Sequence, residues 1–221
     1  MEKARIVSFD LDGTITDSSF ADSVWFQGLP RQYAHERNVT FEEAKKELKK
    51  EYDKVGRMQL EWYDMQYWIK KFSLHITPEK VLNEFKDRIN MFPELPGVFQ
   101  KLREKGFRLI VVSNAHREFV DLELEETKII SYFEHIFSST SDFGLIKNDP
   151  RLYKKICEIC KIHPQQMIHV GDDCLFDFEA PRKLGILAFH LDRTKQCKEQ
   201  FTVRSLQELN EKLESMPQSR P

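Results

Sequence analysis

Residues 5–14 read RIVSFDLDGT, and this stretch decides how the rest of the chain is interpreted. The run 5–9 is apolar and favours a strand, and it leads directly into Asp10 and Asp12. A short continuous apolar run of this kind predicts a strand buried on both faces, as in parallel sheets. Two carboxylates at the end of such a strand are costly unless something neutralises them, and open α/β sheets bind ligands there. The alternative reading is an ordinary Asp-rich turn, in which Gly13 permits the tight bend.

Further apolar runs predict four more strands, at residues 107–112, 135–138, 167–170 and 186–191. Helical patterns lie between and after them, at about 97–105, 116–130, 150–161, 174–184 and 204–215. This alternation predicts an α/β fold with a doubly wound, Rossmann-like parallel sheet and helices on both faces.

The region from about residue 19 to residue 92 has helical signals and no convincing strand. Thr40 and Glu43 form a capping box, Thr77 and Pro78 open another helix, and residues 60–72 are expected to be helical between them. The region is too long for a plain loop. We therefore expect an inserted α-helical cap, residues 19–92, on an α/β core made of residues 1–18 and 93–221.

The composition excludes several classes of protein. The chain has 221 residues, 40% hydrophobic and 32% charged, with a formal net charge of -2. This balance gives no reason to expect a nucleic-acid partner, and no apolar run is long enough for a membrane span or a signal peptide. We expect a cytoplasmic protein that is a monomer or a weak homo-oligomer. Cys157 and Cys160 are interpreted as apolar helix positions, because no second ligand pair follows at zinc spacing.

A second acidic strand end follows residues 167–170, where Gly171 leads into Asp172 and Asp173, with Asp177 further on. Asp172 or Asp173 could also simply cap the next helix. Carboxylates gathered from two strand ends indicate a hard divalent cation with oxygen ligands. Mg²⁺ fits, since it takes few protein carboxylates and keeps water and phosphate oxygens as ligands.

Two weaker signals concern phosphate. Ser113 and Asn114 follow the strand 107–112, where a hydroxyl can donate a hydrogen bond to a phosphoryl oxygen. Lys147 precedes the helix at Pro150, and it could balance the carboxylates and bind phosphate. Taken alone, the first would be a turn and the second a solvated lysine.

The order of these motifs, DxDGT, then Ser, then Lys, then GDDxxxD, resembles that of haloacid dehalogenase-like hydrolases over about residues 5–193. The resemblance implies that Asp10 attacks phosphorus and that Asp12 acts as general acid and base. It implies that Ser113 and Lys147 hold the phosphoryl group, with Asn114, Gly13 and Thr14 as further phosphate-binding residues. Mg²⁺ would be held by Asp10, the backbone carbonyl of Asp12 and Asp172, with Asp177 and Asp173 as further candidates. The sequence departs from the family at Asn148, where a proline is common.

The predicted cap resembles that of the phosphoglycolate phosphatase and β-phosphoglucomutase subgroup. Its aromatic and basic residues could form a substrate surface or the core of a small bundle, and helical spacing favours the bundle. These residues are Trp25, Phe26, Arg31, Tyr33, Trp62, Tyr63, Tyr67 and Trp68. Trp25 and Arg31 are the best substrate candidates because they lie close to the first motif.

The predicted function is a Mg²⁺-dependent phosphatase that hydrolyses a small phosphorylated metabolite through an aspartyl-phosphate. A phosphomutase would use the same residues and stays open. Haloacid dehalogenases usually lack the second acid of the first motif, so Asp12 argues against that chemistry. A non-catalytic phospho-acceptor such as a receiver domain is about half this length and lacks a large insert.

Overall fold

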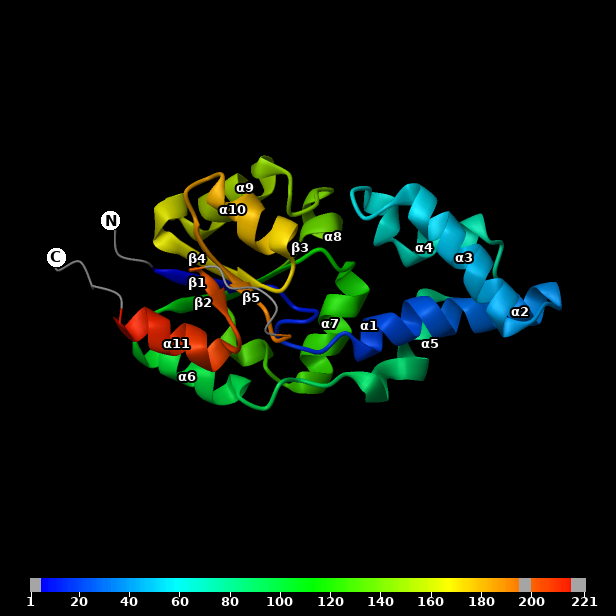
Figure 1. Ribbon diagram of the computed structural model, residues 1–221, viewed down its shortest axis with the longest axis horizontal. Helices are drawn as coiled ribbons and strands as arrows, with labels where there is room; N and C mark the ends of the chain where they lie inside the picture. The colour runs from blue at the N-terminus through cyan, green and yellow to red at the C-terminus, as the bar shows by residue number, and fades with distance from the viewer. Residues whose placement is uncertain (1–4, 195–199, 216–221) are drawn as a thin grey trace.

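The computed structural model describes residues 5–194 and 200–215 (Figure 1). Residues 1–4, 195–199 and 216–221, which the sequence analysis assigned to the core, lie outside the described ranges. A parallel six-stranded sheet forms the centre, in the order β3-β2-β1-β4-β5-β6. The strands are β1 (Ile6–Phe9), β2 (Arg108–Ser113), β3 (His135–Ser138), β4 (Met167–Gly171), β5 (Leu187–Leu191) and β6 (Thr202–Val203). The predicted α/β class and the five predicted strands are confirmed, while β6 was missed because two residues give no readable pattern.

Alternate residues of the strands face two separate apolar layers. Val7 and Phe9 of β1 pack with α6 (Leu95–Glu104) and α11 (Leu206–Ser215) on one side. Ile6 packs with α9 (Pro150–Cys160) on the other side. This period of two places helices on both faces, as the doubly wound fold requires. Both cysteines of the CxxC lie buried in the second layer, which confirms their interpretation as apolar helix positions.

The remaining core helices differ from prediction mainly at their ends. They are α7 (Arg117–Thr127), α8 (Ser139–Phe143) and α10 (Ala180–Arg182), with a π-helical turn at Cys174–Glu179. Helix α7 ends earlier than expected because Lys128 adopts a left-handed conformation, φ 57°. The segment expected as one helix over 174–184 is instead a π-helical turn that continues into α10.

The region between β1 and β2 is helical, as expected, and we call residues 19–92 the insert. Its helices are α1 (Ser19–Ser23), α2 (Leu29–Arg37), α3 (Phe41–Val55), α4 (Met65–Lys71) and α5 (Pro78–Phe85), with a π-helical turn at Val24–Gly28. The Thr40–Glu43 capping box is present. The single helix expected over 60–72 is wrong: a short 3₁₀ turn precedes α4, because the Asp64 side chain caps α4 by accepting from Tyr67 N.

The insert has its own apolar core and lies beyond one end of the sheet, next to α7 (Figure 1). Trp68 and Tyr52 are buried in that core, together with Phe119 of α7. The bundle-core interpretation therefore holds for Trp68, and Trp25, Tyr33, Trp62 and Tyr67 are partly buried against the same core. Helix α7 is the core helix on which the insert rests. No helix in the described ranges is long and apolar enough to cross a membrane.

The two chain segments that enter and leave the insert run side by side. Asp17 N donates to the Asn90 carbonyl at 3.0 Å, and Phe92 N donates to the Ile15 carbonyl at 3.2 Å. Thr16 and Met91 thus form a one-residue antiparallel bridge, which the expectation of a strand-free region omitted. The pairing fixes both ends of the insert directly beside Asp10 and Asp12.

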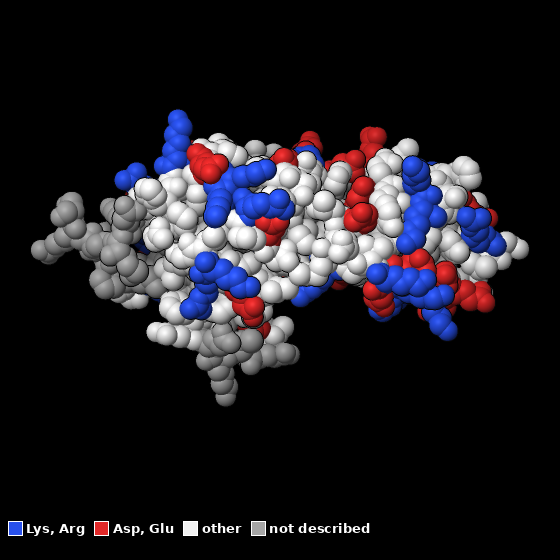
Figure 2. All heavy atoms as spheres, turned by 90° about the horizontal axis from the view of Figure 1, so that it is seen from above, with Lys and Arg blue, Asp and Glu red and all other residues white. Residues whose placement is uncertain are grey.

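Figure 2 shows Lys and Arg mixed with Asp and Glu on the face seen from above.

Candidate active site

Polar side chains from several strand ends meet at the carboxyl edge of the sheet. Asp10 follows β1, Ser113 ends β2 and Asp172 follows β4, and these strands are neighbours in the sheet. Parallel strands end at the same edge, so residues far apart in the chain come together. The loop after α8 adds Lys147, which is 3% exposed.

Lys147 is the cationic centre of the group. Its Nζ lies 2.5 Å from Asp10 Oδ1 and 2.6 Å from Asp177 Oδ1. Burial opposes the charge on the lysine, yet Asp10 and Asp177 together raise the pKa of Lys147 well above its usual value. Lys147 is therefore a permanent ammonium that holds Asp10 in one orientation.

Asp177 is held more completely than the other acids. Its Oδ1 also contacts His169 Nε2 at 3.0 Å, and its Oδ2 accepts from Asp173 N at 3.1 Å. Burial acts against ionisation, but Lys147 and His169 outweigh it and lower the pKa of Asp177 to about 2. His169 is itself buried beneath the site, where Nδ1 contacts Ser8 Oγ at 2.9 Å. Asp177 is thus an anchored anion that orients Lys147.

Asp12 is placed differently from Asp10. Its Oδ1 is buried and has no hydrogen-bond partner among the described residues. Burial, with the nearby negative charge of Asp172, raises the pKa of Asp12 to about 7. A carboxyl group of that proton affinity can both give and take a proton near neutral pH, as the predicted acid/base role requires.

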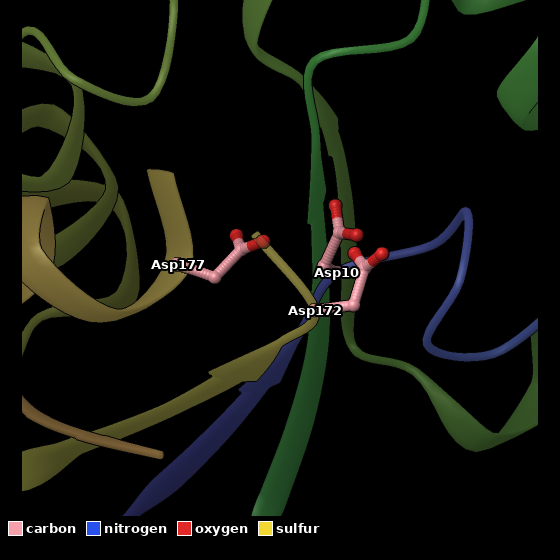
Figure 3. Close-up of side chains that lie close together, drawn as sticks. All are labelled: Asp10, Asp172 and Asp177. Atoms are coloured by element: carbon pink, nitrogen blue, oxygen red, sulfur yellow. The ribbon is translucent and has the colours of Figure 1, made fainter. Parts of the chain in front are cut away.

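Asp10, Asp172 and Asp177 each offer an oxygen within 4.8 Å of the others, and their carboxylates converge from β1, β4 and the turn after β4 (Figure 3). Burial and mutual repulsion raise the pKa of Asp10 well above its usual value and that of Asp172 to about 6. With Asp12, four carboxylates face one lysine. This excess of negative charge and the all-oxygen donor set fit a hard divalent cation.

Gly13 explains how the first turn approaches Asp172 so closely. Its φ is +78°, and a Cβ built there would lie 2.3 Å from Asp172 Oδ2. Only glycine combines that backbone conformation with that lack of a side chain. The next residue, Thr14, donates its hydroxyl to Asp10 Oδ2 at 3.5 Å. Both residues therefore arrange the acids around the strand end.

Ser113 and Asn114 have distinct environments. The Ser113 hydroxyl accepts from Ala115 N at 3.0 Å, which leaves its proton directed elsewhere, and the residue lines the pocket described below. Asn114 Oδ1 accepts from the backbone N of Lys147 at 2.9 Å and from Ser139 Oγ at 2.7 Å. Asn114 therefore fixes the loop that carries Lys147.

A pocket of about 410 Å³ opens between this edge of the sheet and the insert. Asp10, Asp12, Ser113, Asn114 and Lys147 line one side. The insert contributes Ala21, Asp22, Trp25, Arg57, Trp62 and Tyr63 to the other side, and Ser18 lines the pocket just before the insert begins. Trp25, a predicted substrate candidate, thus borders the pocket, stacked on Phe119 with ring centroids 5.5 Å apart. The second candidate, Arg31, is absent from this lining and pairs with Glu84 at 3.3 Å.

Asp173, a further predicted metal candidate, lies outside the three-acid cluster. Its Oδ1 accepts from Leu175 N and Phe176 N, so it caps the turn that follows β4. Its Oδ2 forms an ion pair with Arg57 of the insert. The N-cap interpretation of this residue is confirmed, and the ion pair joins core to insert across the pocket.

Three residues in or beside the site were not singled out from the sequence, namely Arg57, His169 and Glu123, whereas Tyr63 was named among the aromatic residues of the cap. Arg57 and Tyr63 lie in the turn region before α4, where Asn114 Nδ2 donates to the Tyr63 hydroxyl at 3.4 Å. His169 stands in a buried strand, and Glu123 stands on the apolar side of α7. A polar residue in an otherwise apolar position is a readable signal for His169 and Glu123, whereas Arg57 gives none.

Comparison with known proteins agrees with the motifs. A family model described as haloacid dehalogenase-like hydrolase matches residues 7–190. The chain is 25% identical over 191 residues to a glyceraldehyde 3-phosphate phosphatase of Pyrococcus abyssi, covering 82% of this chain and 79% of that protein. It is 26% identical over 196 residues to a phosphoglycolate phosphatase of Aquifex aeolicus, covering 82% and 81%.

A solved structure described as a HAD phosphatase from Thermococcus onnurineus has the same fold. The TM-score is 0.85 at 22% sequence identity, with 95% of this chain and 97% of that chain covered. The resemblance expected from the motifs, including a helical region after the first strand, is confirmed.

Proposed function

Because the chain belongs to the haloacid dehalogenase-like hydrolase family, we propose that it is a Mg²⁺-dependent phosphatase acting through an aspartyl-phosphate on Asp10. The observation that carries this proposal is the pairing of Asp10, held by Lys147 at 2.5 Å, with Asp12, whose pKa is raised to about 7. One acid is oriented as a nucleophile, and the other is tuned to exchange protons.

In the first step, a carboxylate oxygen of Asp10 attacks phosphorus and the bond to the ester oxygen breaks. Lys147 neutralises charge on the phosphoryl group, and the Ser113 hydroxyl can donate a hydrogen bond to it. Asp12 transfers its proton to the departing ester oxygen. Asp10 Oδ2, Asp172 and the Asp12 carbonyl would hold Mg²⁺, which supplies positive charge opposite the phosphoryl oxygens when bound.

In the second step, water attacks phosphorus and releases Asp10. Asp12, now ionised, takes a proton from that water and returns to its starting state. Asp177 takes no part in either bond change, since its oxygens are occupied by Lys147, His169 and Asp173 N. We propose that Asp177 orients Lys147 and contributes to the metal only through its charge.

The substrate is proposed to be a small phosphorylated metabolite, in line with the activities for which the two phosphatase relatives are named. Phosphate would lie against the core and the leaving group against Trp25, Trp62 and Tyr63 of the insert. The insert would then act as a cap, residues 19–92, on a core of residues 1–18 and 93–221. Closing it over the pocket would exclude water other than the attacking molecule.

Turnover assays test the proposal directly. The wild type should release phosphate from p-nitrophenyl phosphate and from a panel that includes 2-phosphoglycolate, glyceraldehyde 3-phosphate and glycerol 3-phosphate, and chelation of Mg²⁺ should stop it. Asp10→Asn should fold normally and fall to background, because an amide cannot form the aspartyl-phosphate. A folded Asp10→Asn variant with near wild-type turnover would contradict the mechanism, and release of halide from 2-haloacids without phosphatase activity would contradict the function.

A further inference from the structure

Glu123 is a buried acid whose role the proposed mechanism leaves open. It lies on α7 between apolar neighbours, including Val120 and Leu124, and is fully buried. Carboxyl groups are seldom buried completely without a partner, since removal from water is costly. Among the described residues, the only hydrogen-bond partner of the Glu123 carboxyl group is the Thr16 hydroxyl, which lies 2.5 Å from Oε2. The other carboxyl oxygen, Oε1, has no partner among them.

Thr16 is the residue that closes the turn carrying Asp12. The Thr16 carbonyl accepts from Gly13 N at 2.7 Å, and Thr16 N donates to the Leu11 carbonyl at 3.1 Å. Thr16 also forms a one-residue bridge with Asp12. The backbone groups on either side of Asp12, those of Leu11 and Gly13, are therefore hydrogen-bonded to Thr16, and Thr16 is joined to α7 by Glu123.

The contacts of the Thr16 hydroxyl indicate how the link works. Its oxygen lies 2.5 Å from Glu123 Oε2 and 3.4 Å from the Leu11 carbonyl oxygen. The single proton of the Thr16 hydroxyl cannot serve both the Leu11 carbonyl and Glu123 Oε2. If Glu123 is neutral, its own carboxyl proton can be donated to the Thr16 oxygen, and the Thr16 proton is then free for the Leu11 carbonyl. Burial, with the nearby charge of Asp12, also raises the pKa of Glu123 well above its usual value.

We infer that Glu123 is a positioning residue for the acid/base Asp12, acting through the Thr16 hydroxyl that closes the turn 11–16. This inference rests on the proposed function. Glu123 does not reach the pocket lining, so it acts on the reaction only through the geometry of Asp12. Nucleophilic attack by Asp10 depends on Lys147 instead, and should be affected much less.

The dependence on the leaving group separates this role from general damage to the fold. Glu123→Leu and Thr16→Val should each reduce kcat/KM for glycerol 3-phosphate, or for the panel's best alkyl phosphate, by roughly tenfold or more, which is part of the 10²–10⁴-fold of general acid catalysis. The kcat/KM of p-nitrophenyl phosphate should change little, because it reports only the first step and that leaving group needs no proton. Glu123→Gln should retain most of the wild-type activity on the alkyl phosphate that Glu123→Leu loses, because the glutamine amide is neutral and can donate to the Thr16 hydroxyl. The double variant should lose no more than either single variant.

Leu124→Ala is the matched control, since it shortens a buried side chain on the same helix that has no polar atom and therefore makes no hydrogen bond to the turn. This variant should lower the stability of the protein while leaving unchanged the ratio of kcat/KM for the alkyl phosphate to kcat/KM for p-nitrophenyl phosphate. The inference is overturned if Thr16→Val, which keeps the side-chain shape, leaves that ratio unchanged, or if all variants lose both activities in proportion to their stability. An inactive wild type would instead contradict the proposed function.

Discussion

The clearest test of the candidate metal site is how stabilisation by Mg²⁺ depends on pH. Burial and mutual repulsion raise the pKa of Asp172 to about 6 and that of Asp12 to about 7 without metal. The folded protein then binds more protons than the unfolded chain between about pH 4 and pH 7. These groups therefore make the metal-free protein less stable as pH rises through that window, and their effect levels off above it.

Mg²⁺ reverses that trend because it binds the ionised carboxylates. A pKa of about 6 leaves about a tenth of Asp172 ionised at pH 5 and about 99% at pH 8. The apparent dissociation constant should thus be about tenfold larger at pH 5. Part of the Asp172 side chain stays in contact with water although surrounding protein raises its pKa, so screening reduces this to about threefold to tenfold. The raised pKa of buried Asp10 acts in the same direction.

Thermal unfolding over a Mg²⁺ series at pH 5, 6.5 and 8 measures the effect. The midpoint temperature of unfolding should rise with Mg²⁺ at pH 8 and much less at pH 5. For a chain of this length, each kcal/mol of added stability raises that midpoint by about 2–4 °C. Asp172→Asn should remove most of the shift, whereas Glu47→Gln, which changes an exposed acid on the insert, should leave it intact. Equal shifts at pH 5 and pH 8, or an unaltered shift in Asp172→Asn, would refute the site as described.

Three further substitutions have distinct expected outcomes. Asp12→Asn should lower kcat/KM far more for alkyl phosphates than for p-nitrophenyl phosphate, and equal losses of kcat/KM would count against the acid role. Lys147→Met should abolish turnover and lower the free energy of unfolding by about 3–5 kcal/mol in urea, because Asp10 and Asp177 lose their buried counter-charge; a change under about 1 kcal/mol would contradict that pairing. Arg57→Ala breaks a half-exposed ion pair with Asp173, so it should cost less than about 1 kcal/mol yet raise KM, and an unchanged KM for every ester would exclude Arg57 from recognition.

The sheet and most of its acid groups could be predicted because both depend on local patterns. Buried parallel strands are continuous apolar runs, and polar residues directly after them must meet at one edge. Asp10, Asp172 and Ser113 were located in this way. Strand β6 could not be, since Thr202–Val203 is too short to show a period, and it pairs only because β5 is already in place.

The ends of helices were harder to predict than their existence. Helix α7 ends where Lys128 takes a left-handed conformation. The pattern of apolar residues does not predict such a conformation at a lysine. The expected helix over 60–72 breaks because Asp64 offers a better cap for α4 than a helical position would provide. Local capping chemistry therefore overrode the apolar period in both regions.

The insert's contribution to the site depends on contacts that no local pattern encodes. Arg57 meets Asp173, 116 positions later in the chain, only because the two ends of the insert are paired beside β1. That same pairing passes through Thr16, which Glu123 fixes to α7, and Phe119 of α7 lies in the core of the insert. Helix α7 therefore touches both the turn that carries Asp12 and the body of the insert. We therefore expect that a rearrangement of the insert on α7 would alter the position of Asp12, which would couple the proposed substrate recognition to the proposed acid catalysis through this one helix.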